Sequence, residues 1–304
     1  MTENLNKLSG DYAKLQTKVF SRWTTNVLRP LGIVIKDVTK ELTDGVALVQ
    51  LAEILTKKSA PRKWDRQPKI AIQKTQNCDL ALEMFTNDGV KFVSISGKDV
   101  QDAHNDSLTL GLIWTLILKY SIGAVQDKSG ASQSSSQKAQ SNQPGSATQA
   151  LMNWCKDEIK DYGDVSDFKQ INLSIAALIN NYRPDLVHFD SLDKNNANDT
   201  AKVVVDAFKA LNIPVLLDVE DIANGCDDKT LFTQLALVKQ ELDTLPHFGE
   251  VQERGITLKA PVTKGKYPFP GKNFMLHGRL RVYKNWENNS RFRAKRQERA
   301  NLGY

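Results

Sequence analysis

A serine- and glutamine-rich segment, residues 124–147, constrains the fold of this chain more than any other feature. It contains seven serines and five glutamines but no aromatic residue. Such a segment buries too little apolar surface to offset its loss of backbone entropy, so residues 123–147 are predicted to form a flexible linker. Its root-mean-square reach of roughly 27 Å would let the flanking blocks either touch or separate.

Apolar residues at helical spacing dominate both flanking blocks. The first stripe steps by three or four positions through Tyr12, Leu15, Val19, Trp23 and Val27. Further helices are expected at residues 46–55, 75–85, 107–120, 150–162, 173–182, 199–211 and 230–245. Strand-like alternation is scarce in both blocks, so the sequence predicts an all-α fold. It consists of two helical domains, at residues 12–122 and 148–245, followed by a basic and mostly irregular tail, residues 246–304.

The residue types that carry catalysis or bind metals form no recognisable site. Three widely spaced cysteines, Cys78, Cys155 and Cys226, argue against a disulfide framework and are expected to be buried packing residues. The four histidines lie in no metal or nucleophile motif. Asn198 stands where a calcium loop starting at Asp193 requires glycine. The sequence therefore predicts no catalytic residue, no metal site and no cofactor, and the chain is not expected to be an enzyme.

The chain also lacks the signals of export and of membrane insertion. Residues 1–10 are polar and offer no signal-peptide core. The longest apolar stretch, residues 108–120, is interrupted by Thr109, Thr115 and Lys119 and falls short of the ~18–20 apolar residues that cross a bilayer. The sequence thus predicts an intracellular protein without a transmembrane segment.

The net charge of +6 is distributed unevenly along the chain. Residues 1–120 carry +4, from 17 basic and 13 acidic side chains, whereas residues 148–245 carry −8, from 9 basic and 17 acidic side chains. The tail carries +9, from 13 basic and 4 acidic side chains. Opposite charges on the two helical blocks favour their mutual attraction, and a basic tail favours acidic partners.

Several co-linear segments resemble the calponin homology domain, a helical fold. In the first block, Phe20 to Leu28, Asp44 to Leu48 and Ser107 to Tyr120 are similar to the opening and close of a type-one domain. The segments that resemble a type-two domain are residues 151–155, 177–186, 207–214 and 217–222. This order resembles the tandem actin-binding domain of the alpha-actinin, spectrin, filamin and cortexillin group, over residues 12–245. One departure is Leu173-Ser174, which stands where the family usually carries Asp-Gly and predicts a changed helix entry.

The resemblance implies that the chain binds filamentous actin (F-actin) through three surfaces and catalyses no reaction. The first is the outward face of the first helix, with Lys14, Lys18, Arg22 and Thr25. The second combines the start of the buried helix with a nearby basic loop and comprises Asp102, Asn105, Leu108, Thr109, Arg62, Lys63, Trp64 and Arg66. The third, on the first helix of the second domain, has Met152 and Lys156. Basic residues on the first surface would steer association with acidic actin, although they also suit the solvated face of a surface helix.

The acidic second domain suggests regulation. Its docking on the basic first domain would cover part of the actin surface, and the long linker would keep closure only modestly favourable. Crosslinking of filaments would need dimerisation or a longer chain, because the heptad-like run at residues 231–245 spans only about two heptads. We therefore expect a cytoplasmic protein of the cytoskeleton and cell cortex, in which the first domain carries most of the actin contact and the second modulates it.

The tail lies outside the resemblance. Residues 279–283 alternate like a short strand, and a basic cluster follows with Arg291, Arg293, Lys295, Arg296 and Arg299. This cluster suits a solvated tail, or an anion-binding contact with actin, with acidic phospholipids or with the second domain. Nucleic acid is disfavoured as a partner because a basic cluster alone specifies no nucleic-acid-binding fold. The alternative functions are a membrane- or phosphoinositide-associated adaptor that acts through the tail, and a microtubule or signalling scaffold.

Overall fold

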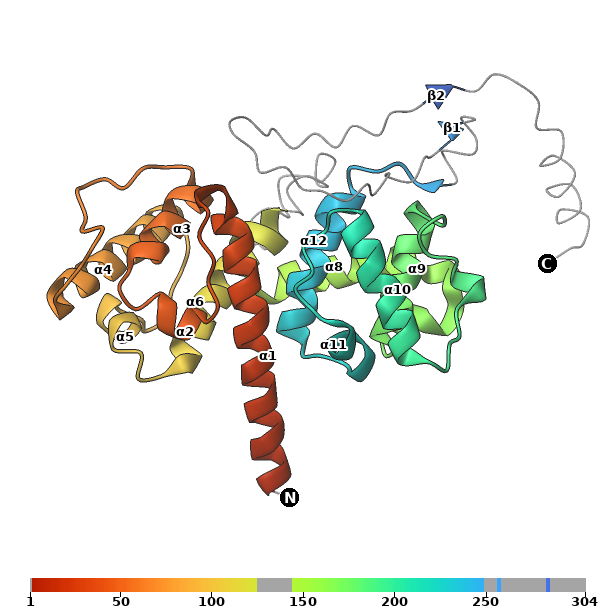
Figure 1. Cartoon of the computed structure of the whole chain (residues 1–304), viewed down its shortest axis with the longest axis horizontal. Coiled ribbons are helices and arrows are strands. Elements are labelled where there is room, and N and C mark those ends of the chain that lie inside the picture. Colours follow the sequence, from red (N-terminus) through yellow and green to blue (C-terminus); the bar gives the residue numbers. More distant parts are fainter. Residues whose placement is uncertain (1, 125–143, 249–255, 258–282, 285–304) are drawn as a thin grey trace, which may run out of the picture. The chain divides into compact units, whose positions relative to one another are not determined.

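The computed structural model describes residues 2–124, 144–248, 256–257 and 283–284 (Figure 1). The chain divides into two units, residues 1–245 and residues 246–304. In the second unit, β1 (Ile256–Thr257) pairs antiparallel with β2 (Tyr283–Lys284), so that Ile256 lies opposite Lys284. The strand expected at residues 279–283 is described only at Tyr283, and most of the predicted linker and tail lies outside the described residues. Within the described part of the chain, no helix is long and apolar enough to span a membrane.

The first unit confirms the all-α prediction. Its first half consists of α1 (Thr2–Leu28), η1 (Arg29–Leu31), α2 (Val38–Glu41), α3 (Val46–Thr56), α4 (Ala71–Asn87), α5 (Gly97–Asp102), α6 (Asp106–Ile117) and the π-helical η2 (Leu118–Gly123). Its second half consists of α8 (Pro144–Glu158), η3 (Lys160–Asp167), α9 (Ile171–Tyr182), η4 (Phe189–Ser191), α10 (Ala197–Ala210), α11 (Val219–Asn224) and α12 (Asp228–Leu242). We refer to these halves as the first and second domains.

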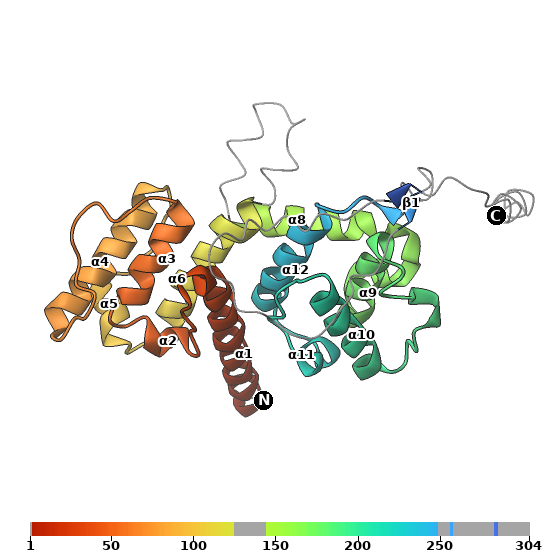
Figure 2. The ribbon, with the colours of Figure 1, turned by 45° about the horizontal axis from the view of Figure 1, so that its top comes forward.

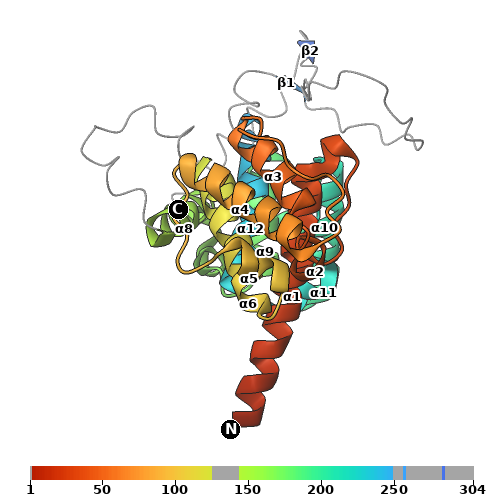
Figure 3. The same cartoon turned by 90° about the vertical axis from the view of Figure 1, so that its left-hand side faces the viewer.

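The apolar stripe of α1 anchors that helix in the first domain. Phe20 and Trp23 are buried, and the Phe20 ring stacks on Trp114 of α6 with centroids 6.3 Å apart. The indole Nε1 of Trp23 donates a hydrogen bond to Ser121 Oγ of η2 at 2.9 Å. The N-terminal part of α1 runs past the other helices (Figure 3). Core packing therefore fixes the C-terminal half of the first helix.

The entry to α3 requires a glycine. Gly45 has φ of +73°, and a Cβ at this position would lie 2.5 Å from Asn77 Cβ and 2.7 Å from the Cys78 nitrogen of α4. The neighbouring Asp44 accepts a hydrogen bond from the Val46 nitrogen at 2.9 Å, which satisfies one of the unpaired amides at the helix start. The Asp44-Gly45 pair thus allows α3 and α4 to pack closely.

The starts of α8 and α9 are among the helix boundaries that differ from the sequence predictions. The helix α8 begins at Pro144, inside the segment assigned to the linker, because proline is well accommodated in the first turn of a helix and Ala147 is buried there. The pair Leu173-Ser174 lies inside α9, where the Ser174 hydroxyl donates to the Val165 carbonyl at 2.6 Å. The helix α9 begins at Ile171, two residues before this pair.

The cysteines behave as packing residues. Cys78 and Cys155 are buried, and Cys226 is half-buried. Burial raises the pKa of the Cys78 thiol to about 12, and burial likewise raises the pKa of Cys226 to about 12. Thiols with such pKa values are almost entirely protonated at neutral pH and are poor nucleophiles.

Candidate functional site

Lys18 and Arg22, two of the α1 residues predicted to point outward, contact the second domain. The Lys18 ammonium nitrogen lies 2.6 and 2.8 Å from the two carboxylate oxygens of Asp221 and 3.2 Å from Asp218 Oδ2. Asp218 precedes α11 and Asp221 lies in its first turn. The side chains of Lys18 and Asp221 are 34% and 14% exposed, so this pair is partly withdrawn from solvent.

Arg22, one helical turn further along α1, binds the same region. Its two guanidinium nitrogens donate to the two carboxylate oxygens of Asp218 at 2.7 and 3.1 Å, and one of them also donates to the Leu216 carbonyl at 3.0 Å. Bidentate pairing of this kind fixes orientation as well as charge. Burial would raise the pKa of the Asp218 carboxyl, but hydrogen bonds from Arg22 and Lys18 outweigh it and hold that pKa below its ordinary value. Asp218 thus accepts hydrogen bonds from both Lys18 and Arg22.

A third polar contact extends this interface along α1. The Gln16 amide donates to Asp227 Oδ1, at the start of α12, at 3.0 Å. The segment η2 packs against α8 and α12, so the end of the first domain also contacts the second (Figure 2). We call the contacts of Gln16, Lys18 and Arg22 with the second domain the interdomain clamp.

The other two residues predicted on the first surface lie outside the clamp. The Lys14 side chain is 85% exposed and lies 3.9 Å from Asp11 on the same helix. The Thr25 hydroxyl donates to the Ile35 carbonyl at 3.0 Å and accepts from the Ile35 nitrogen at 2.8 Å. Thr25 therefore ties α1 to the loop before α2, and Lys14 is the most exposed of the three basic residues of the first surface.

The second predicted surface is partly buried. Asn105 is exposed and caps α6, accepting a hydrogen bond from the Ser107 nitrogen at 3.0 Å. Asp102 and Leu108 are half-buried. Thr109 is only 2% exposed, because α6 is apolar nearly all round and this position faces the core. Thr109 is thus a core residue, which corrects the expectation that it lies on a binding surface.

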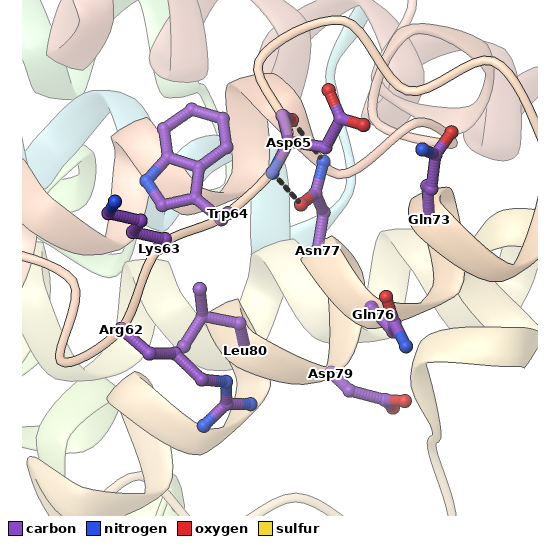
Figure 4. Close-up of a pocket in the computed structure, with 9 residues that line it drawn as sticks. All are labelled: Arg62, Lys63, Trp64, Asp65, Gln73, Gln76, Asn77, Asp79 and Leu80. Atoms are coloured by element: carbon purple, nitrogen blue, oxygen red, sulfur yellow. Dashed lines mark hydrogen bonds between the residues drawn. The ribbon is translucent and has the colours of Figure 1, made fainter.

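The basic loop of the second surface lies between α3 and α4 beside a pocket of about 490 Å³. Figure 4 shows loop residues Arg62, Lys63 and Trp64 along one side of this pocket, with Gln73 and Asp79 of α4 along the other. Arg62 pairs with Glu83 at 2.6 Å. The Arg66 guanidinium lies 4.4 Å from the centroid of the Trp64 ring, a cation–π contact.

Buried Asn77 holds this loop in place. Its amide nitrogen donates to the Asp65 carbonyl at 2.7 Å and to the Asp44 carbonyl at 3.2 Å, and its amide oxygen accepts from the Asp65 nitrogen at 3.2 Å (Figure 4). Asn77 is 2% exposed. Because buried amide groups are costly to leave unpaired, these three bonds couple the loop firmly to α4.

The third predicted surface and the tail contribute less to the described site. Met152 is half-buried and packs against the core, whereas Lys156 is exposed in the last turn of α8. The basic tail cluster lies outside the described residues; its members are Arg291, Arg293, Lys295, Arg296 and Arg299. Among the residues that the structure describes, no group of three or more His, Cys, Asp or Glu side chains could hold a metal ion.

Sequence reasoning did not identify the acidic half of the clamp. The net charge of −8 pointed to the second domain as a whole but not to Asp218, Asp221 or Asp227. The sequence does carry a signal for Asp218 and Asp221, because acidic residues three positions apart at the start of a helix often form a capping box. In the structure, Asp221 Oδ2 accepts a hydrogen bond from the Asp218 nitrogen at 2.7 Å. Helix-start carboxylates that face outward are available to bind a partner's cations.

Comparison with known proteins finds the same domain family in both halves of the first unit. The model of the calponin homology (CH) domain matches residues 14–122 and 145–241. Alpha-actinin A of Dictyostelium discoideum is 34% identical over 229 residues, which cover 73% of this chain and 25% of that protein. Alpha-actinin-4 of Homo sapiens is 32% identical over 237 residues, covering 74% of this chain and 24% of that protein.

Two fission-yeast proteins are also similar. Alpha-actinin-like protein 1 of Schizosaccharomyces pombe is 31% identical over 249 residues, covering 78% of this chain and 37% of that protein. The crystal structure of the actin-crosslinking core of Schizosaccharomyces pombe fimbrin superposes with a TM-score of 0.50 at 18% identity, covering 76% of this chain and 48% of that one. This chain therefore spans about a quarter to a little over a third of the length of these curated relatives.

Proposed function

The chain belongs to the calponin homology family, with two CH domains in tandem, and from that premise we propose that it is a non-catalytic protein that binds F-actin. The first domain carries most of the contact, and the second domain modulates it. The relatives that support this proposal are alpha-actinins and the actin-crosslinking core of a fimbrin. The place of action is the cytoskeleton, at the cell cortex.

The observation that carries the proposal is the face of α1 defined by Lys14, Lys18 and Arg22. These three cations lie four residues apart on one side of a helix, and they are the residues that the family resemblance assigns to actin. Positive charge in such a stripe raises the rate of association with an acidic filament and fixes its orientation. Asn105 and the loop residues Lys63 and Arg66 are exposed and complete the proposed contact.

The interdomain clamp supports the modulating role of the second domain. Lys18 and Arg22 cannot contact a filament while they bind Asp218 and Asp221, so the clamped arrangement covers part of the proposed actin surface. All four side chains retain some solvent exposure, and such ion pairs together contribute about 0.5–2 kcal/mol. A bias of that size is small enough for actin itself to displace the second domain.

Crosslinking requires a second actin site in the same assembly. Because this chain matches only a fraction of the length of the alpha-actinins, we propose crosslinking as a property of a dimer or of a longer protein that contains this chain. A monomer of the chain would decorate filaments without bundling them.

The proposal is tested by co-sedimentation with F-actin at physiological salt. The intact chain is expected to pellet with filaments, and Lys14→Glu/Lys18→Glu/Arg22→Glu is expected to lose most of that binding. Lys169→Glu/Lys202→Glu/Lys209→Glu is the matched control, because it makes the same charge change on exposed residues of the second domain outside the predicted surfaces. If the intact chain does not pellet, or if the α1 variant pellets as well as the control, the proposed actin surface is wrong.

The basic tail favours a second candidate function, that of an adaptor on acidic membrane lipids. Its charge of +9 in residues 246–304 is the observation behind this candidate. Replacement of Arg291, Arg293, Lys295, Arg296 and Arg299 by glutamine tests it. If this variant keeps F-actin binding but associates less with phosphatidylserine vesicles than the unchanged chain does, the tail acts in parallel with the CH domains. Loss of F-actin binding would instead place the actin contact in the tail.

A further inference from the structure

The connection between α3 and α4, together with the first turn of α4, forms a strongly basic surface. Residues 57–74 contain seven basic side chains and a single acidic one, Asp65. The basic residues are Lys57, Lys58, Arg62, Lys63, Arg66, Lys69 and Lys74, and all but Lys74 are exposed. Two of them are engaged in ion pairs, Arg62 with Glu83 and Lys58 with Asp88. The remaining cations give the surface a net positive charge that attracts an acidic partner.

Two isoleucines project from the same surface. Ile70 is 56% exposed and Ile72 is 57% exposed, although both are large apolar side chains. These two isoleucines lie two positions apart and are flanked by Lys69 and Lys74. The surface therefore offers apolar groups next to cations, which suits a partner that accepts both.

The start of α4 presents these isoleucines in a fixed orientation. The Gln73 side-chain oxygen accepts hydrogen bonds from the backbone nitrogens of Lys69 and Ile70, at 2.8 and 3.1 Å. Asn77 fixes the loop at Asp65, as described above. A surface that is already ordered loses little conformational entropy when it binds.

We propose that residues 57–74 are a docking surface for an acidic lipid bilayer, with the basic side chains at the anionic headgroups and Ile70 and Ile72 inserted into the interfacial layer. Each lysine or arginine near an anionic leaflet strengthens binding through its attraction to the headgroups. Neither isoleucine lines the neighbouring pocket, and both are more than half exposed. Exposed apolar side chains beside cations suit the boundary between anionic headgroups and acyl chains.

This surface is separate from the interdomain clamp. The clamp uses Gln16, Lys18 and Arg22 of α1, whereas the α3–α4 connection runs along another edge of the first domain (Figure 1). Lipid docking therefore requires no opening of the clamp. It shares Lys63 and Arg66 with the proposed actin contact, so the test below changes only Ile70 and Ile72, which lie outside that contact.

The test is flotation of the full-length chain with vesicles, in a background where Arg291, Arg293, Lys295, Arg296 and Arg299 are glutamine so that the tail does not contribute. The vesicles are phosphatidylcholine alone, or phosphatidylcholine with about 20% phosphatidylserine. The background protein is expected to float with the acidic vesicles only. Ile70→Ser/Ile72→Ser is expected to lower its partition by about tenfold, because the apolar insertion is lost while the charge is unchanged.

Leu31→Ser/Val34→Ser is the matched control, since these two aliphatic side chains of the first domain are 50% and 64% exposed. This variant is expected to float like the background protein. The proposal is wrong if the background protein does not bind acidic vesicles, or if the two serine variants partition equally. It is also wrong if Ile70→Ser/Ile72→Ser keeps vesicle binding but loses F-actin pelleting, which would assign the isoleucines to the actin contact.

Discussion

Lys18 and Asp221 lie 203 positions apart in the chain, yet the lysine ammonium nitrogen approaches both carboxylate oxygens, at 2.6 and 2.8 Å. This contact joins the first helix of the first domain to the second domain. It also places one cation of the proposed actin surface where it is satisfied without actin. The relative strength of the Lys18 contact with Asp221 and of its proposed contact with actin is the central property to test.

Removal of the acidic half of the clamp is expected to strengthen actin binding. Asp218→Asn/Asp221→Asn leaves Lys18 and Arg22 without their carboxylate partners on the second domain. The affinity for F-actin should rise by about 3- to 30-fold, because this factor corresponds to the free energy by which the ion pairs of the clamp favour the clamped arrangement. Asp161→Asn/Asp164→Asn makes the same charge change on exposed residues of the second domain and should have little effect. Equal affinities for the two variants in co-sedimentation would show that the clamp does not limit binding.

The clamp is expected to open only at low pH. Because the pKa of Asp218 is lowered in the clamped state, its contribution is fully present above its ordinary pKa of about 4 and is lost as the pH falls through the lowered value. Small-angle X-ray scattering should therefore give a constant radius of gyration from about pH 8 to 5. The wild type is expected to expand below about pH 4, and Asp218→Asn should lack that pH-dependent expansion. A transition centred near pH 6 in the wild type would instead indicate a histidine.

Gly45 is expected to tolerate no side chain. Gly45→Ala places a methyl group 2.5 Å from Asn77 Cβ at a positive φ, so it should lower the free energy of unfolding by at least about 2 kcal/mol. Gly111→Ala is the matched control, because Gly111 lies inside α6 and a Cβ there meets no atom within 4 Å. That change should stabilise the protein by about 0.5–1 kcal/mol. Urea denaturation measures both, and equal effects would contradict the close packing of α3 on α4.

Loss of the Asn77 amide is expected to release the α3–α4 loop. Asn77→Ala removes three hydrogen bonds to the backbone of Asp44 and Asp65 and should cost about 2–3 kcal/mol of stability. Limited trypsin digestion should then cut faster after Lys63, Arg66 and Lys69 than in the wild type. Gln76→Ala, on the same helix but exposed, is the control and should leave the cleavage rate unchanged.

The cysteines are expected to be unreactive in the folded protein. Burial raises the pKa of both Cys78 and Cys226 to about 12, so the thiolate fraction at pH 7.5 is very small. A thiol reagent such as dithiobis-nitrobenzoate should label the native chain slowly and should titrate three thiols after denaturation. Rapid labelling of one thiol in the native state would show that half-buried Cys226 is more accessible than its environment implies.

Local sequence patterns gave most of the helices because helical periodicity depends on residues three and four positions apart. The stripe through Leu15, Val19 and Trp23 predicted α1, and the Asp44-Gly45 turn predicted the entry to α3. The pattern could not place the boundary of α8, since a serine- and glutamine-rich segment suggests a linker until Ala147 is found packed against the core.

The candidate site was predicted only in part. Periodicity identified Lys18 and Arg22 as one face of α1 but could not decide whether that face meets solvent, actin or the second domain. In the same way, Thr109 was assigned to a surface because it lies near the start of α6, and only the packing of α6 shows that it is buried.

The helices, the tandem order of the CH domains and the charge of each block follow from the amino-acid order, because they depend on composition and short-range spacing. Which charges meet depends on tertiary packing. Asp218 and Asp221 are brought to α1 by the packing of η2 against α8 and α12 and of α1 against α12. Contacts between residues some 200 positions apart depend on how whole domains pack, and no local pattern encodes that arrangement.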